Sequence, residues 1–474
     1  MKSRAVFLSL IAALASAFAA APAAERPNIV LCMADDQGWG DIGHRDPKLK
    51  TPVLDEMASS GLRFDRFYAA APVCSPTRGS VLTGRHPNRF GCFSWGHSLR
   101  PQEITLAEVL QKAGYATGHF GKWHLGPVDA DSPVNPGHSG FDRWVSAPNF
   151  YDNDALMSEG GRVAQHRGES SMIAVDAALP FLRESAAAGK PFFAVIWFGS
   201  PHAPHQGSAE LNALYPDEPR GKQNFYAEMT GIDRAMGKLR EALKAMGAAE
   251  NTLLWYNSDN GALPVGSTGG LSGKKGDLGE GGIRVPAMIE WPARIKAPRV
   301  TEVPASTVDI YPTALAAAGV ALPENQPPLD GIDLSPLLDG QMESRPQPLG
   351  FWVHPTGGIS TPSEKILAQA LADQQAGGTG AVADPRSGTD FASTKKQYPE
   401  DEFPGPAAWI DGDWKLAVGG KRKGGGAPGL YHLKDDPTEK NDLSAKEPER
   451  AEAMAKQLAA WRASVARSLN GKDY

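Results

Sequence analysis

The sequence predicts a large α/β domain, with a mainly parallel sheet sandwiched by helices, and a smaller C-terminal α+β subdomain. Continuous apolar runs, among them "NIVLCMA", "PFFAVIWFGS" and "TLLWYNS", alternate with amphipathic helical stretches. Apolar strands of this kind are buried on both faces, as in a parallel sheet covered by helices. After about residue 340 the regular alternation of apolar strands and amphipathic helices ends, which marks the predicted domain boundary near residue 345.

The first domain, predicted over residues 25–345, is built by alternation. After "NIVLCMA" comes the helical "TPVLDEMASSG", with Thr51 as its N-cap, Pro52 in its first turn and Gly61 at its end. The next stretches are, in order, "ITLAEVLQKAG", "YATGHFG", the helical "SSMIAVDAALPFLRESAAAG", "PFFAVIWFGS", the helical "FYAEMTGIDRAMGKLREALKAMG" and "TLLWYNS".

The second unit, predicted over residues 346–474, begins irregularly. Residues 354–408 are rich in Gly, Pro, Ser and Ala, around a helix-like "SEKILAQALADQQAGG". Two short strands, "AAWIDGDWKLAVGG" and "PGLYHL", flank a basic Gly-rich turn. The last stretch, "EPERAEAMAKQLAAWRASVARSL", has apolar residues at helical spacing.

Residues 1–24 have the pattern of a secretory signal peptide. Lys2 and Arg4 precede a short apolar run that ends in small residues, too short to span a bilayer. We therefore expect a periplasmic or secreted protein. Cleavage leaves 46 basic and 54 acidic residues, so the chain has no general attraction for nucleic acid or an anionic membrane.

Three cysteines are too few for a disulfide framework in an exported chain of this length. Cys32 lies inside the first apolar run and is expected in the core. The sequence leaves a Cys32–Cys92 bridge open. Cys74 stands where a helix begins and needs its own explanation.

Oxygen ligands follow two of the predicted strands. Asp35 and Asp36 end "NIVLCMADD", while Asp259 and Asn260 end "TLLWYNSDN". Sites in open α/β sheets form at the carboxyl ends of strands. If the two ends meet, they offer a site for a hard cation such as Ca²⁺ or Mg²⁺. Each motif alone is also typical of an ordinary loop.

Cationic and imidazole groups occupy similar places. Lys122 and His124 lie two residues apart, so in extended backbone they would face the same side. His202 follows another strand, and Lys274 and Lys275 lie on a glycine-rich loop. Together with the oxygen ligands, these groups suit a tetrahedral oxyanion.

Cys74 is poorly explained as a plain thiol. A thiolate is a soft ligand, badly matched to a site of hard oxygen ligands. No Cys–His–Asn pattern of a thiol hydrolase accompanies it. Arg78 lies one helical turn further on, and the backbone N–H groups at this helix start are available to an anion.

The run from Cys74 to Gly79, "CSPTRG", followed by "SVLTGRHP", resembles the signature of the formylglycine-dependent sulfatases of the alkaline phosphatase superfamily. The resemblance covers nearly the whole chain after the signal. It includes "DDQGWGD", "GYATGHFGKWHLG", "SPHAPH", "SDNG", "KKGDLGEGGIRVP" and the tail "DGDWKL…GLYHL…DPTEKNDL".

This resemblance implies that the formylglycine-generating machinery converts Cys74 into formylglycine. It implies one divalent cation, calcium or alternatively magnesium, bound by Asp35, Asp36, Cys74, Asp259 and Asn260. Around the sulfate it places Arg78, Lys122, His124, His202 and Lys275, with Lys275 preferred over Lys274 and His124 as the base of the second step.

The expected function is hydrolysis of sulfate esters, most plausibly of a sulfated carbohydrate. The alternatives are a phosphonate or phosphate ester hydrolase of the same superfamily and a non-catalytic binder of sulfated glycans. Residues 354–408 are expected either to overhang the site or to form a disordered surface insertion. In the first case they would shape the leaving-group site with Trp39, Trp95, His97 and the "APNFYDND" loop, and His354 could contact the sugar.

Overall fold

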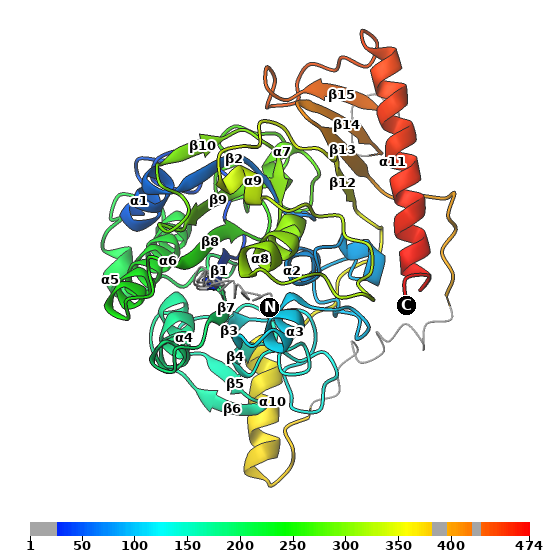
Figure 1. Ribbon diagram of the computed structural model, residues 1–474. Helices are drawn as coiled ribbons and strands as arrows, with labels where there is room; N and C mark the ends of the chain where they lie inside the picture. The colour runs from blue at the N-terminus through cyan, green and yellow to red at the C-terminus, as the bar shows by residue number, and fades with distance from the viewer. Residues whose placement is uncertain (1–25, 382–395, 420–427) are drawn as a thin grey trace, which may run out of the picture.

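A computed structural model describes residues 26–381, 396–419 and 428–474, and it confirms the predicted α/β architecture (Figure 1). The predicted signal peptide, residues 1–24, lies outside the described residues. Within them, a large sheet has eleven strands in the order β10-β2-β9-β8-β1-β7-β3-β4-β5-β6, with β11 paired to β2. Its strands are β1 (Asn28–Ala34), β2 (Leu62–Tyr68), β3 (Ala116–Lys122), β4 (Arg143–Ala147), β5 (Leu156–Glu159), β6 (Arg162–Gln165), β7 (Phe192–Trp197), β8 (Thr252–Ser258), β9 (Arg284–Glu290), β10 (Arg299–Thr301) and β11 (Ala305–Ser306).

The centre of the sheet is parallel and its flanks are mixed. Strands β8, β1, β7, β3 and β4 pair in parallel, whereas β9 pairs antiparallel with β2 and β8, and β5 with β4 and β6. Because the central strands run in the same direction, their carboxyl ends lie at one edge of the sheet. The loops that follow these strands therefore lie close together at that edge.

Helices cover both faces of this sheet. One face packs against α1 (Pro52–Ser60), α4 (Ser170–Ala187) and α6 (Arg220–Ala245), and the other against α2 (Cys74–Thr83), α3 (Leu106–Lys112) and α8 (Ile310–Ala318) (Figure 1). Strand β1 alternates between the two cores and is buried in both. The remaining short helices are η1 (Pro87–Phe90), α5 (Ala209–Asn212), α7 (Glu280–Ile283), η2 (Thr307–Asp309) and α9 (Ser335–Leu338).

The three cysteines are buried and free. Cys32 lies in the core under α1, α4 and α6, as expected, while Cys92 lies in the core on the opposite face. The sheet therefore separates the two thiols, and the Cys32–Cys92 bridge that the sequence left open does not form.

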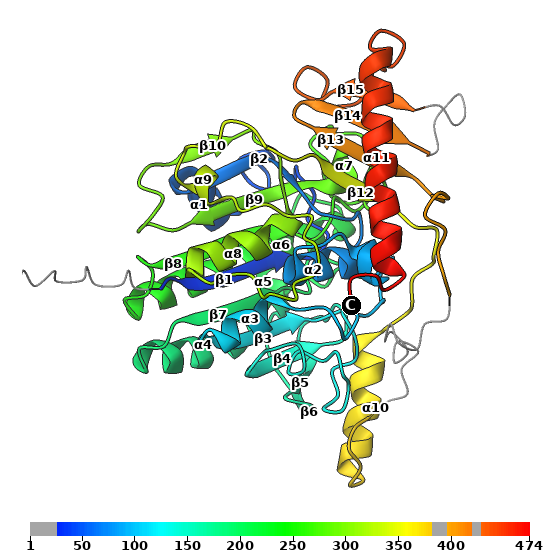
Figure 2. The same ribbon diagram turned by 45° about the vertical axis from the view of Figure 1, so that its right-hand side comes forward.

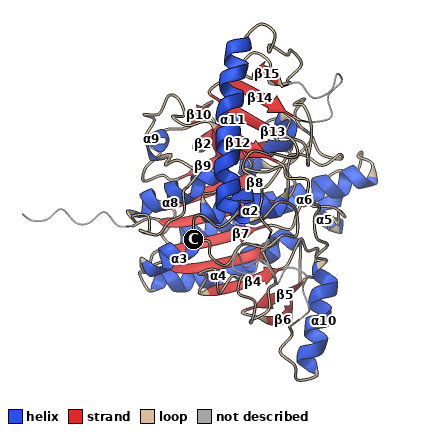
Figure 3. Ribbon diagram, turned by 90° about the vertical axis from the view of Figure 1, so that its right-hand side faces the viewer, coloured by secondary structure: helices blue, strands red, loops and turns tan. Residues whose placement is uncertain are grey.

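The C-terminal region forms a second, four-stranded antiparallel sheet. Its order is β12 (Leu349–Trp352), β13 (Ala407–Asp411), β14 (Trp414–Val418) and β15 (Gly429–His432). Helix α11 (Pro448–Leu469) lies across this sheet (Figures 2 and 3). Helix α10 (Ser363–Gln375) instead packs on β5 and β6 at the edge of the large sheet. The predicted basic turn falls on residues 420–427, outside the described residues.

A buried ion cluster joins the small sheet to the large domain. The ammonium of Lys415, on β14, lies 2.9 Å from Glu280 Oε1 and 3.0 Å from Glu439 Oε1, and donates a hydrogen bond to the Leu278 carbonyl. Burial opposes both charges, yet pairing keeps the pKa of Glu280 below its usual value and that of Lys415 above its own. Glu280 is the first residue of α7, so the small sheet anchors this helix.

None of the described helices is long and apolar enough to cross a bilayer.

We expect Lys415→Met to lower the free energy of unfolding by about 3–5 kcal/mol, the usual loss when one partner of a buried ion pair is removed. Lys434→Met, at an exposed lysine of the same subdomain, serves as the control and should change stability little. Urea denaturation followed by tryptophan fluorescence measures both. Equal stability of the two variants would contradict a structural role for the cluster.

Candidate active site

Four oxygen-bearing side chains meet at the carboxyl ends of β1 and β8. The two strands are parallel neighbours, with Ala34 opposite Ser258, so the residues that follow them come together. The Asp36 N–H donates a hydrogen bond to Asp259 Oδ1 (3.1 Å), and the Asn260 amide donates one to Asp36 Oδ1 (2.8 Å). Asp36 has a φ of 75°, in the left-handed region, which turns the chain away from the strand direction.

Two of these oxygens fit a hard cation. Asp35 Oδ1 and Asn260 Oδ1 are buried and accept no hydrogen bond from any described residue. The Asn260 amide group already uses its nitrogen on Asp36, which leaves the oxygen as the acceptor. Buried polar atoms ordinarily find a partner, and carboxylate and amide oxygens are the ligands of Ca²⁺ and Mg²⁺.

The two aspartates titrate differently. Burial raises the pKa of Asp35 to about 8, in spite of Lys122 and Arg78 nearby. Burial acts on Asp36 too, but Lys275 and His202 outweigh it and hold the pKa of Asp36 below its usual value. The protein's own cations therefore balance Asp36 more fully than Asp35, and a divalent cation would supply the charge that Asp35 lacks.

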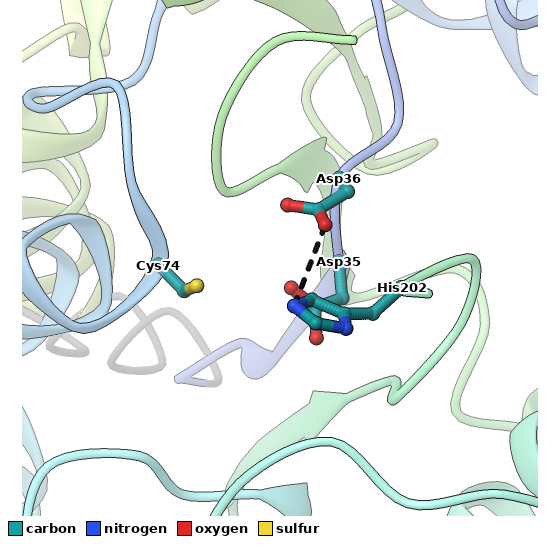
Figure 4. A group of neighbouring side chains, drawn as sticks. All are labelled: Asp35, Asp36, Cys74 and His202. Carbon is teal, nitrogen blue, oxygen red and sulfur yellow. Dashed lines mark ion pairs between the residues drawn. The ribbon is translucent and has the colours of Figure 1, made fainter. Parts of the chain in front are cut away.

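Cys74 is the first residue of α2 and points toward this carboxylate group (Figure 4). One ligand atom each from Asp35, Asp36, Cys74 and His202 lies within 4.8 Å of the others. Burial raises the pKa of the Cys74 thiol, although Lys122 and Lys275 lower it in part. At neutral pH the thiol is therefore protonated, which makes it a poor nucleophile and a poor metal ligand.

Each of the two aspartates after β1 is paired with a lysine. Lys122, the last residue of β3, places its ammonium 2.6 Å from Asp35 Oδ2. Lys275 places its own 2.6 Å from Asp36 Oδ1, and burial of this ammonium is outweighed by Asp36, so the pKa of Lys275 is raised. The neighbouring Lys274 is exposed to solvent. An ammonium has three donors, so each lysine retains N–H groups for an anion.

Arg78 is fully buried one turn into α2. Its guanidinium donates a hydrogen bond to Asp259 Oδ2 (2.7 Å) and one to the Lys122 carbonyl (3.2 Å), and it lies over the ring of Trp197. These contacts fix a permanent positive charge beside Cys74.

His202 faces the carboxylates with one ring nitrogen. Its Nε2 lies 3.6 Å from Asp36 Oδ2, and its Nδ1 donates a hydrogen bond to the Ala203 carbonyl (2.6 Å) (Figure 4). The ring stacks on Phe150, with centroids 4.2 Å apart. Burial lowers the pKa of His202 to about 4, so the ring is neutral at pH 7 in the free protein.

His124 departs from the backbone that the sequence predicted. Strand β3 ends at Lys122, and His124 has a φ of 56°, so the expectation of extended backbone through both residues is wrong. The buried imidazole instead places Nε2 3.3 Å from the hydroxyl of Thr361, a residue of the 354–408 segment. Left-handed backbone is strained for a residue other than glycine. At His124 it is stabilised by the packing around the buried side chain.

The described part of the 354–408 segment lies beside the Trp95 loop. The Ile359 N–H donates a hydrogen bond to the Trp95 carbonyl (2.9 Å), and the His97 ring contacts the Gly357 carbonyl (2.9 Å). Trp95 remains 40 % exposed. These contacts hold the described start of the segment beside the Trp95 loop, and its role toward a bound substrate stays a prediction.

The other residues expected near the leaving group have different surroundings. The guanidiniums of Arg45 and Arg284 both lie over the Trp39 ring, at 3.6 and 4.8 Å from its centroid. His354 stacks on Phe93 and contacts the Thr356 hydroxyl. Sequence reasoning missed Thr361, because a threonine inside a Gly- and Pro-rich segment has no spacing that marks it.

Comparison with known proteins agrees with this arrangement. The model of the Sulfatase family matches residues 27–320. Canine N-acetylgalactosamine-6-sulfatase is 36% identical over 374 residues, 70% of each chain, and human arylsulfatase A is 37% identical over 385 residues, 73% of each.

Among solved structures, Ps i-CgsB in complex with k-i-k-neocarrahexaose superposes with a TM-score of 0.77 at 24% identity, covering 92% of this chain and 93% of its own. The phosphonate monoester hydrolase of Agrobacterium radiobacter gives 0.59 at 19% identity, covering 93% and 96%. At these identities the structures show a shared fold.

We expect the protein to bind one Ca²⁺ or Mg²⁺ ion, and Asn260→Ala to weaken Ca²⁺ binding roughly 10–100-fold, as for a disturbed metal shell. Calorimetry on chelator-treated protein measures the affinity, and elemental analysis identifies the metal. The control is Asn153→Ala, at an asparagine whose amide donates a hydrogen bond to the Gln206 carbonyl and accepts one from the Ser170 N–H. Stoichiometric zinc, or unchanged Ca²⁺ affinity in Asn260→Ala, would contradict this ligand set.

Proposed function

The chain belongs to the sulfatase family and is a sulfuric ester hydrolase, and on this premise we propose that it removes sulfate from a sulfated carbohydrate, using formylglycine formed from Cys74 and one divalent cation. The observation that carries the proposal is the place of Cys74. Its thiol is buried and protonated, yet it stands at a helix start among carboxylates, an imidazole and three cations. A protonated thiol is a poor nucleophile and a poor metal ligand, whereas an oxygen nucleophile would suit a site of carboxylates and a hard cation.

The carbohydrate substrate is supported by the relatives. The first of them is named for the 6-sulfate of N-acetylgalactosamine, and it matches over 70% of this chain. The half-exposed Trp95 beside the segment is suited to pack against the apolar face of a sugar ring. His97 is less suited, because its ring is held at the Gly357 carbonyl.

The cation-binding residues would be Asp35, Asp36, Asp259 and Asn260, together with the modified residue 74. When bound, the cation supplies positive charge beside residue 74, and the hydrate of formylglycine supplies a hydroxyl nucleophile on a carbon that can afterwards release sulfate. We favour calcium because the ligands are all oxygens.

The protein's own residues bind and orient the sulfate ester. Lys122 and Lys275 direct their remaining N–H groups at the sulfuryl oxygens, and Arg78 contributes a fixed charge on the α2 side. These donors are already ordered by their carboxylate partners, so little reorganisation accompanies the reaction.

Two histidines handle protons. Nδ1 of His202 donates a hydrogen bond to the Ala203 carbonyl and so retains its proton. Proton exchange therefore takes place at Nε2. A bound anionic ester favours the imidazolium, which can then give the Nε2 proton to the departing sugar oxygen. We assign His124 as the base that restores residue 74 after sulfate transfer.

Export and maturation complete the proposal. We propose that residues 1–24 direct the chain to the periplasm or outside the cell, and that the formylglycine-generating machinery is its partner during synthesis. The "CSPTR" run from Cys74 to Arg78 is the sequence that supports this partner.

We predict that residue 74 of the active enzyme is formylglycine. Trypsin releases residues 67–78 as one peptide, whose mass should correspond to replacement of CH₂–SH by CHO. Cys32 and Cys92 should remain alkylatable thiols after denaturation and act as internal controls. Full activity in a sample whose Cys74 is entirely an alkylatable thiol would overturn the assignment.

We further predict release of sulfate from 4-nitrophenyl sulfate and from at least one member of a panel of sulfated mono- and oligosaccharides, N-acetylgalactosamine 6-sulfate included. Lys275→Ala should lower kcat/KM about 10²–10³-fold, the usual cost of one oxyanion donor. Lys274→Ala is the matched control, since the neighbouring ammonium is exposed, and should retain activity.

The panel also decides between ester classes. Faster hydrolysis of 4-nitrophenyl phosphate or a phenylphosphonate monoester than of every sulfate ester would favour the phosphonate or phosphate hydrolase. Tight binding of sulfated glycans without sulfate release would indicate the non-catalytic binder.

A further inference from the structure

We propose that Thr361 is a positioning residue for His124: the hydrogen bond between its hydroxyl and Nε2 (3.3 Å) fixes the orientation of the imidazole ring. The inference rests on the proposed function, because it concerns how the base of that reaction is held. Thr361 belongs to the segment between the small sheet and α10, far along the chain from every other residue of the site.

The place of the Thr361 hydroxyl is fixed by its neighbours. The Phe150 N–H donates a hydrogen bond to Asn149 Oδ1 (2.8 Å), and a backbone N–H can only donate. The amide of Asn149 is thereby oriented, and its Nδ2 donates to Thr361 Oγ1 (3.1 Å). Thr361 Oγ1 is thus held by Asn149 on one side and lies 3.3 Å from His124 Nε2 on the other.

The hydroxyl is held in place from both directions along the chain. On one side, the Asn149 N–H donates a hydrogen bond to Ser363 Oγ (2.9 Å). On the other, the Ile359 N–H reaches the Trp95 carbonyl (2.9 Å). Thr361 lies between these two attachments and is buried, so its side chain has little freedom to turn away.

The same attachments connect Thr361 to the Cys74 side of the site. The Gly96 N–H, next to Trp95, donates a hydrogen bond to Ser75 Oγ (2.9 Å). The Trp95 loop therefore connects the segment to the start of α2, while Ser363 connects it to the loop after β4. Because His124 has left-handed backbone, its ring direction is not fixed by a strand, and an outside contact is needed to set it.

Thr361→Val keeps the shape of the side chain and removes the hydroxyl. With 4-nitrophenyl sulfate, which has no sugar for the segment to recognise, we expect kcat to fall about 10- to 100-fold with KM nearly unchanged. This is less than the 10²–10⁴-fold contribution of a general base itself. Thr361→Ser restores the hydroxyl and should recover most of kcat. Conversion of Cys74 is checked by mass in each variant.

The matched control is Thr356→Val in the same segment, where the lost hydroxyl contacts His354 instead (2.7 Å) and kcat should stay at the wild-type value. An unchanged kcat in Thr361→Val, a change confined to KM, or no recovery in Thr361→Ser would overturn the inference.

A second readout needs no turnover. Spectra of ¹⁵N-histidine-labelled wild-type protein, with His124 assigned by its loss in His124→Gln, should show a single tautomer of His124, and Thr361→Val should shift it toward a mixture. A mixture of tautomers in the wild type would overturn the inference. A wild type that hydrolyses no sulfate ester, yet shows a single tautomer that Thr361→Val disturbs, would overturn only the proposed function.

Discussion

Three carboxylates buried at the ends of two adjacent parallel strands are the constraint on which the rest of this site depends. Asp35, Asp36 and Asp259 are removed from water, and uncompensated charges in that position would be very costly. Each therefore has a cation of its own, contributed by α2, by the end of β3 and by the loop before α7. The same three cations are the groups that we propose bind the sulfate ester. Burial at the strand ends thus explains both why the cations are ordered and why a divalent metal fits among them.

The small C-terminal sheet supports this arrangement from outside it. Through Lys415 it holds Glu280, the first residue of α7, and α7 begins five residues after Lys275. Through the segment before α10 it brings Thr361 to His124. The two attachments reach different parts of the site, the Lys275 side and the His124 side. A region that looks peripheral in Figure 1 is therefore part of the scaffold of the reaction centre.

Much of the fold and of the site was predictable from the sequence for a local reason. Apolar runs such as residues 28–34 are buried on both faces wherever they occur, so they predicted the central strands. Motifs that follow such strands, Asp35–Asp36 and Asp259–Asn260, come together once the strands are parallel neighbours. The start of α2 at Cys74 was likewise visible, because Pro76 is tolerated in a first helical turn.

What the sequence by itself determined is therefore the set of strands, the helix start at Cys74 and the family resemblance carried by its motifs. Only the tertiary structure decided the orientation of His124 and its neighbours. The left-handed backbone at His124 is stabilised by packing that no local pattern records, and its partner Thr361 lies 237 residues further along the chain. The positions of Arg45 and Arg284 over the Trp39 ring were decided in the same way. Local patterns encode burial and backbone preference, whereas the direction of a hydrogen bond depends on which distant groups the fold brings within reach.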